Sequence, residues 1–82
     1  MTDSHKKGLA AKTNTLLAYI IDFYRRNHYG PTFSEVMTDL GWSSKSLVDY
    51  HVTQLERRGL VERVPYHPRS LKPTQLAQGV IQ

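Results

Sequence analysis

The sequence predicts a mostly helical α+β fold: a winged helix-turn-helix of three helices and a two-stranded β-hairpin. Apolar residues recur at helical spacing in three segments, each bounded by capping residues, prolines or glycines. A turn of about three residues that contains a glycine joins the second and third segments, which is the helix-turn-helix arrangement. After the third segment, apolar and charged residues alternate as in a half-buried strand, which predicts the hairpin.

The first helix is expected over residues 13–28. Its apolar face comprises Leu16, Leu17, Ile20, Ile21 and Tyr24. Thr13 or Asn14 is expected to cap its start, because a short side-chain oxygen accepts a hydrogen bond from a free backbone N–H of the first turn. Gly30 and Pro31 follow, and this pair predicts the end of the helix.

The second helix is short, about Phe33 to Leu40. Thr32 and Glu35 have the spacing of a capping box, in which each side chain satisfies a backbone N–H of the other residue. Gly41 follows as the left-handed cap that favours glycine. Trp42 in the turn is expected to fill the angle between two short helices rather than to stack on a base.

The third helix is expected to begin after Ser43 or Ser44 and to run to about Arg58, with Gly59 as its stop. Its buried face comprises Val48, Val52 and Leu55, flanked by Leu47 and His51. The four histidines of the chain show no metal-ligand spacing. We therefore expect His51 to pack beside the core, and we assign no metal site.

The hairpin is expected from residues 60–64 and 69–74, which read LVERV and RSLKPT. Leu71 should lie on the same side of the hairpin as Leu60, Val61 and Val64. Two prolines keep the pairing short, because proline cannot donate to a β-ladder.

The predicted domain covers residues 13–74. Residues 1–12 are polar and small, and we expect a flexible N-terminal arm there. Residues 75–82 are too few for another domain, and we expect a C-terminal tail that is frayed or extends the last strand.

The composition excludes several classes of protein. A chain of 82 residues without cysteine is no disulfide scaffold and holds no zinc-thiolate site, and it suits a reducing cytoplasm. The longest apolar stretch, Leu16–Ile21, is too short for a membrane span or a signal peptide. No nucleophile-and-base pair, glycine-rich phosphate loop or carboxylate pair appears, so we expect neither an enzyme nor a cofactor.

The net charge is +4, and most of it falls between Ser43 and Thr74, in the third helix and the hairpin. A small basic domain can bind polyanions such as nucleic acid. The same charge is also compatible with solubility alone, so it does not decide the function by itself.

One face of the third helix is polar: Ser44, Lys45, Ser46, Asp49, Tyr50 and Thr53. In a helix-turn-helix, the N-terminal half of this helix enters the major groove of DNA. Serine hydroxyls can meet several base edges, and lysine can reach a guanine or a phosphate. Asp49 would have to accept from a cytosine amino group or act through water. The alternative is an ordinary solvated helix face.

Three arginines, Arg58, Arg63 and Arg69, are expected to hold phosphates, with those of the hairpin also able to probe the adjacent minor groove. The alternative is that Tyr66 and Pro68 cover the hairpin end while the arginines lie along the surface.

An ordered set of residues resembles the N-terminal DNA-binding domain of LexA-type SOS repressors. The shared pattern is Gly30-Pro31-Thr32, Glu35-Val36, Leu40-Gly41, Ser44, His51, Leu55 to Leu60 and Pro68 to Leu71. The resemblance covers about residues 13–74 and implies that the third helix is the recognition helix. Its matching positions are Ser44, Ser46, Leu47, Asp49 and Tyr50.

The chain departs from that family in two ways. Leu47 replaces a small residue, Ser46 an asparagine and Tyr50 often a glutamate, so the usual operator of the family should not be assumed. LexA-type repressors also continue into a self-cleaving protease domain with a Ser-Lys dyad, whereas this sequence stops at Gln82. We expect a stand-alone winged helix.

We therefore expect a sequence-specific binder of double-stranded DNA that regulates transcription, as a small repressor of bacterial, phage or plasmid genes. A single module has a small footprint, so a homodimer on a two-fold site is expected. No membrane or small-molecule partner is evident. Two alternatives stay open: a winged-helix adaptor that binds protein, and a DNA-binding protein of replication or recombination.

Overall fold

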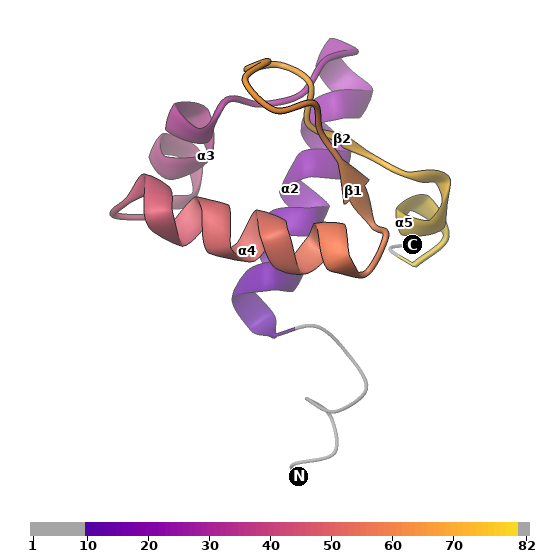
Figure 1. The fold of residues 1–82 in the computed structure, drawn as a ribbon, viewed down its shortest axis with the longest axis horizontal. Helices are drawn as coiled ribbons and strands as arrows, with labels where there is room; N and C mark the ends of the chain where they lie inside the picture. The colour runs from indigo at the N-terminus through magenta and orange to yellow at the C-terminus, as the bar shows by residue number, and fades with distance from the viewer. Residues whose placement is uncertain (1–9, 81–82) are drawn as a thin grey trace, which may run out of the picture.

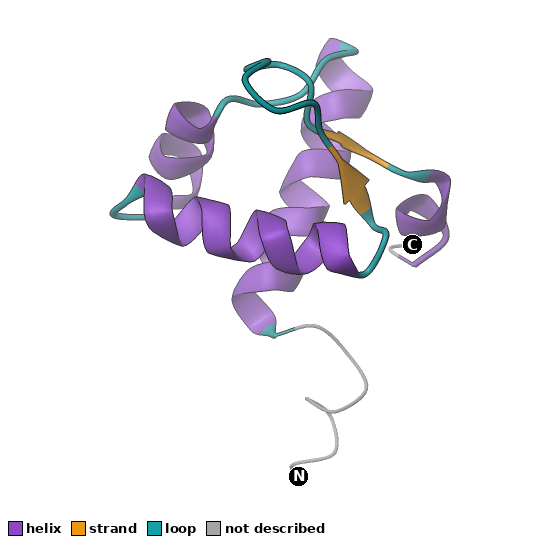
Figure 2. Ribbon diagram, viewed as in Figure 1, coloured by secondary structure: helices purple, strands orange, loops and turns teal. Residues whose placement is uncertain are grey.

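The computed structural model describes residues 10–80, and within them the chain forms four helices and one two-stranded sheet (Figure 1). The elements are α2 (Ala11–Asn27), α3 (Phe33–Leu40), α4 (Lys45–Arg57), β1 (Val61–Glu62), β2 (Lys72–Pro73) and α5 (Gln75–Val80). Helices dominate the molecule, and the short sheet lies beside them (Figure 2). The prediction of a mostly helical winged helix-turn-helix is confirmed. No helix in this part of the chain is long and apolar enough to cross a membrane.

The first helix of the fold, α2, begins earlier than the sequence predicts. Ala11 is its first residue, and Ala10 occupies the cap position without a side-chain hydrogen bond. The prediction that Thr13 or Asn14 caps this helix is therefore wrong. Lys12, expected in the flexible arm, lies inside the helix, while residues 1–9 of that arm lie outside the described residues.

The helix-turn-helix is built by the caps that the sequence predicts. The Thr32 hydroxyl accepts from the Glu35 N–H at 3.1 Å, and the Glu35 carboxylate accepts from the Thr32 N–H at 2.9 Å. Gly41 ends α3 with a left-handed φ of 71°, a conformation that glycine adopts without strain. Ser44 caps α4, where its hydroxyl accepts from the Leu47 N–H at 3.1 Å. These caps confirm the capping box and choose Ser44 over Ser43.

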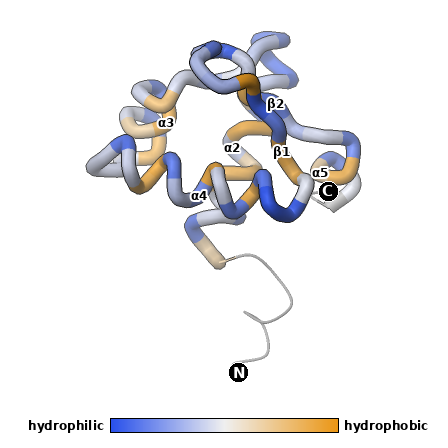
Figure 3. The backbone as a smooth tube through the Cα atoms, viewed as in Figure 1, coloured by the Kyte–Doolittle hydropathy of each residue, from blue (hydrophilic) through white to orange (hydrophobic). Residues whose placement is uncertain are grey.

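The core forms where α2 packs against α4 and β2. In Figure 3, hydrophobic and hydrophilic residues alternate along α4, as expected for a helix with one buried face. The buried cluster includes Leu16, Leu17, Ile20, Val36, Val48, Val52, Leu55 and Leu71. Trp42 belongs to this cluster and is only 8% exposed, which confirms its structural role in the turn.

One polar pair lies inside this core. Thr13 Oγ1 and His51 Nδ1 share a buried hydrogen bond of 2.7 Å that joins α2 to α4. The Trp42 and His51 rings also lie 5.2 Å apart. His51 is therefore a packed histidine, as predicted. The pairing also explains why Thr13 caps no helix: its side chain points into the core.

The wing is a minimal hairpin. Val61 pairs with Pro73 and Glu62 with Lys72, in antiparallel register, and the two strands end there. Leu71 is buried as predicted, but Val64 is 54% exposed, so the prediction that both lie on one side is wrong. The reason is that the ladder covers only residues 61–62 and 72–73, and residues 63–71 form a loop.

The C-terminal segment is helical. Residues 75–80 form α5, so the prediction of a frayed tail or an extended strand is wrong for them; residues 81–82 lie outside the described residues. The Thr74 hydroxyl accepts from the Ala77 N–H at 3.3 Å and donates to the Gly59 carbonyl at 2.7 Å. Ala77 is completely buried. This segment therefore adds to the core.

Replacing Gly30 by alanine should lower the free energy of unfolding by about 3 kcal/mol, because overpacking forces backbone to move. A Cβ atom at Gly30 would lie 1.8 Å from the Leu71 carbonyl oxygen. At Gly79, a Cβ atom would meet nothing within 4 Å, so Gly79→Ala is the matched control. Urea denaturation measures both variants, and equal stabilities would contradict the close approach of the wing to Gly30.

Replacing Thr13 by valine should lower the free energy of unfolding by about 1 to 3 kcal/mol, because the buried His51 Nδ1 loses its partner. Thr15→Val is the control, since Thr15 is exposed on the same helix.

Burial lowers the pKa of His51 below its ordinary value of 6.5, and the Lys12 charge lowers it further. The unfolded state then binds the proton more readily, so stability should fall as the pH drops below 6.5. Denaturation midpoints that stay constant from neutral to mildly acidic pH would contradict a neutral, buried imidazole.

Candidate nucleic-acid interface

The first half of α4 presents the polar face that the sequence predicts. Lys45, Ser46, Asp49 and Tyr50 are exposed on this helix, while the other face is buried in the core. Ser44 is partly buried and holds the helix cap. Three further predicted residues are placed as follows: Leu47 packs against the core, Thr53 is partly buried and Arg58 is exposed at the end of the helix.

Tyr50 is the largest exposed side chain of this face. It is 58% exposed, and the edge of its ring meets the His51 ring at a centroid distance of 5.0 Å. His51 is in turn fixed by Thr13 and by the Trp42 ring. A chain of contacts from the core therefore supports an exposed aromatic residue beside Ser46.

Arg63 lies between the wing and α4 and pairs with two carboxylates. Its Nε donates to Glu56 at 3.1 Å, and its Nη2 donates to Asp49 at 3.2 Å. The guanidinium also lies over the Phe33 ring, 5.6 Å from the centroid. Arg63 is predicted from sequence to hold phosphate, and Asp49 would have to accept from a cytosine amino group or act through water. The structure brings these two side chains together.

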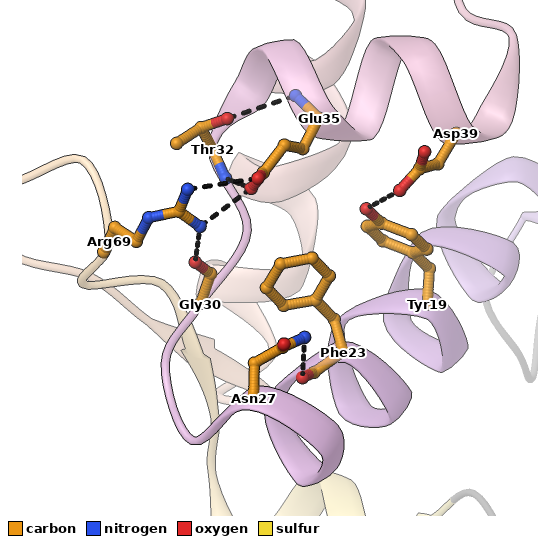
Figure 4. Close-up of polar contacts among 8 residues, drawn as sticks. All are labelled: Tyr19, Phe23, Asn27, Gly30, Thr32, Glu35, Asp39 and Arg69. Carbon is orange, nitrogen blue, oxygen red and sulfur yellow. Dashed lines mark hydrogen bonds and ion pairs between the residues drawn. The ribbon is translucent and has the colours of Figure 1, made fainter.

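Arg69 is bound in the same manner at the other end of the wing (Figure 4). Its Nη1 and Nη2 donate to the two Glu35 carboxylate oxygens at 2.8 and 3.0 Å, and Nη1 also donates to the Gly30 carbonyl at 3.2 Å. The Tyr29 ring lies 4.6 Å from the guanidinium carbon. The hydrogen bond from Arg69, followed by that from the Thr32 N–H, lowers the pKa of Glu35. Arg69 therefore clamps the wing to the start of α3.

Sequence reasoning missed Glu35 and Glu56 as partners of these arginines. One signal was available for Glu56: it follows Asp49 by seven residues, which places both carboxylates on one side of a helix. No comparable signal pointed to Arg69, because Glu35 lies 34 residues away from it.

Two predicted cations, Lys45 and Arg58, form no ion pair among the described residues. Lys45 also lines a groove of about 730 Å³ between the starts of α3 and α4 and the wing loop. Further lining residues are Phe33, Asp49, Arg63, Tyr66 and Pro68. The exposed face of α4 and the wing thus flank one concave surface.

Ser70 makes hydrogen bonds within the wing loop. The Ser70 hydroxyl accepts from the Val64 N–H at 2.8 Å and lies within hydrogen-bond distance of the Val64 and His67 carbonyls. Tyr66 has a left-handed φ of 66° and is fully exposed at the tip.

The described residues contain no group of histidine, cysteine, aspartate or glutamate able to hold a metal ion.

The sequence of this chain is similar to a known protein family. A family model for the LexA DNA binding domain matches residues 6–70. The LexA repressor of Pediococcus pentosaceus is 34% identical over 70 residues, which are 85% of this chain and 34% of that protein. That of Ligilactobacillus salivarius is 35% identical over 74 residues, 90% of this chain and 34% of that protein. That of Gluconobacter oxydans is 37% identical over 68 residues, 83% of this chain and 29% of that protein.

The chain spans about a third of the length of the first of these curated relatives. The matched region contains the helix-turn-helix, its capping box and most of the wing. Since the family model covers most of the sequence and the structure has the fold that the resemblance implies, the chain belongs to the LexA DNA-binding domain family.

Proposed function

We propose that this protein binds a specific sequence of double-stranded DNA and represses transcription by occluding a promoter. One observation carries the proposal: the exposed start of α4 and the wing flank the same concave surface. In a helix-turn-helix domain, that part of the second helix lies in the major groove. Membership of a DNA-binding family and the repressor function of the relatives named above support the same reading.

Within this surface, the proposed base-reading residues are Lys45, Ser46 and Tyr50. Serine and tyrosine hydroxyls both donate and accept, and an aromatic ring can contact a thymine methyl group. Arg58 and Thr53 lie further along α4 and are proposed to contact phosphate. Ser44 and Leu47 are proposed chiefly to hold α4 in place, because Ser44 caps the helix and Leu47 packs on the core.

Selection from random duplexes with the purified protein should yield one preferred sequence, and raising the salt concentration should weaken its binding steeply. Ser46→Ala and Tyr50→Phe should change the preference at individual base positions. Arg58→Ala should weaken all sequences about equally and reduce the salt slope by about 1. If no duplex binds even at low salt, the chain is not a DNA-binding module, and an adaptor that binds protein becomes the better explanation.

Two copies are proposed to occupy one two-fold site. A single module buries roughly 600 to 1,000 Å² on DNA, which is small for a tight specific complex. Lys45 and Arg58 are few cations for one copy to rely on. The selected site should therefore be palindromic, and sedimentation on that duplex should show two bound chains. One tightly bound chain on a site without symmetry would contradict this prediction.

A further inference from the structure

Asp49 occupies an unusual place for an acidic residue. It lies on the exposed face of α4, among the residues proposed to read bases, and its side chain is 56% exposed. A free carboxylate there would repel the phosphates of a bound duplex. In the structure, however, Asp49 Oδ1 accepts a hydrogen bond of 3.2 Å from Arg63, so its charge is paired within the protein.

The same arginine has a second carboxylate partner further along the helix. Glu56 accepts from Arg63 Nε at 3.1 Å, and it follows Asp49 by seven residues, about two helical turns. A guanidinium is planar and its N–H donors are fixed in a fork. Two carboxylates on one side of α4 therefore determine both the position and the orientation of Arg63, while Phe33 of α3 covers its face.

This arrangement bears directly on the wing. Arg63 directly follows β1 and begins the loop of residues 63–71, and Arg69 lies near the other end of that loop. Arg63 fixes the first end to α4, and Arg69 fixes the second end to the start of α3 through Glu35. The strands that flank this loop are only two residues long each, so the loop depends on side-chain pairs as well as on the sheet.

We propose that Asp49 is a positioning residue for DNA recognition: together with Glu56 it holds Arg63, sets the distance between α4 and the wing, and reads no base itself. The proposal rests on the proposed function, in which α4 and the wing both contact one duplex. Lys45, one turn before Asp49, forms no ion pair with it or with any other described residue, and so stays available to the DNA.

A double-mutant cycle on the selected duplex tests this role. Asp49→Asn and Arg63→Gln should each weaken binding by about two- to fivefold for every sequence, the size expected for loss of an exposed ion pair. The double variant should be no weaker than Arg63→Gln alone, because both changes break the same contact and Asp49→Asn also removes the carboxylate that Arg63→Gln leaves unpaired. Glu56→Gln should reproduce the effect of Asp49→Asn, although Glu56 lies about two turns beyond Asp49.

Base preference separates positioning from direct readout. If Asp49 acts through Arg63, selection with Asp49→Asn should return the same preferred sequence as the parent protein. A preference that changes at one base position, and changes equally in the Arg63→Gln background, would overturn the proposal. Asp22→Asn is the matched control, because it breaks an exposed ion pair with Arg26 on α2.

A measurement without DNA keeps this test independent of the proposed function. Heteronuclear NOE values and amide exchange report the order of residues 64–70 in the free protein. Asp49→Asn, Glu56→Gln and Arg63→Gln should each loosen that loop, whereas Asp22→Asn should not. A loop that stays as ordered as in the parent protein would overturn the proposal. Absence of DNA binding by the parent protein would instead refute the proposed function.

Discussion

The candidate interface depends on two arginines that fix the wing to the helices. A ladder of two residues per strand cannot hold a hairpin in place by itself. Arg63 ties the wing to α4 through Asp49 and Glu56, and Arg69 ties it to α3 through Glu35 and the Gly30 carbonyl. Charge-assisted, multidentate contacts give direction as well as attraction, so they fix the shape of the groove between helix and wing.

Because of these ion pairs, the net charge overstates the number of cations that have no partner within the protein. From the sequence alone, the cations between residues 43 and 74 all look like possible phosphate ligands. Three of them, Arg63, Arg69 and Lys72, are paired with carboxylates of the same chain. The cations proposed for DNA are consequently few, which supports the proposal that two copies share one site.

Much of the fold could be predicted from sequence because its signals are local. The apolar spacing of α2 and α4, the Thr32–Glu35 capping box and the glycine after α3 all involve residues within a few positions of one another. The same local reasoning placed the start of α2 wrongly, because Thr13 pairs with His51 across the core instead of capping the helix. It also missed α5, whose helical state accompanies burial of Ala77 and the Thr74 cap.

By itself, the sequence determined where α3 and α4 lie, where the turn between them falls and which face of α4 meets solvent, since periodicity and capping act over one or two turns. Only the tertiary structure decided what the charged residues do. Asp49 and Arg63 are 14 residues apart, and Arg69 is 39 residues from the Gly30 carbonyl that it binds. Such pairs form only after the helices pack, because packing alone brings these distant side chains within hydrogen-bond distance.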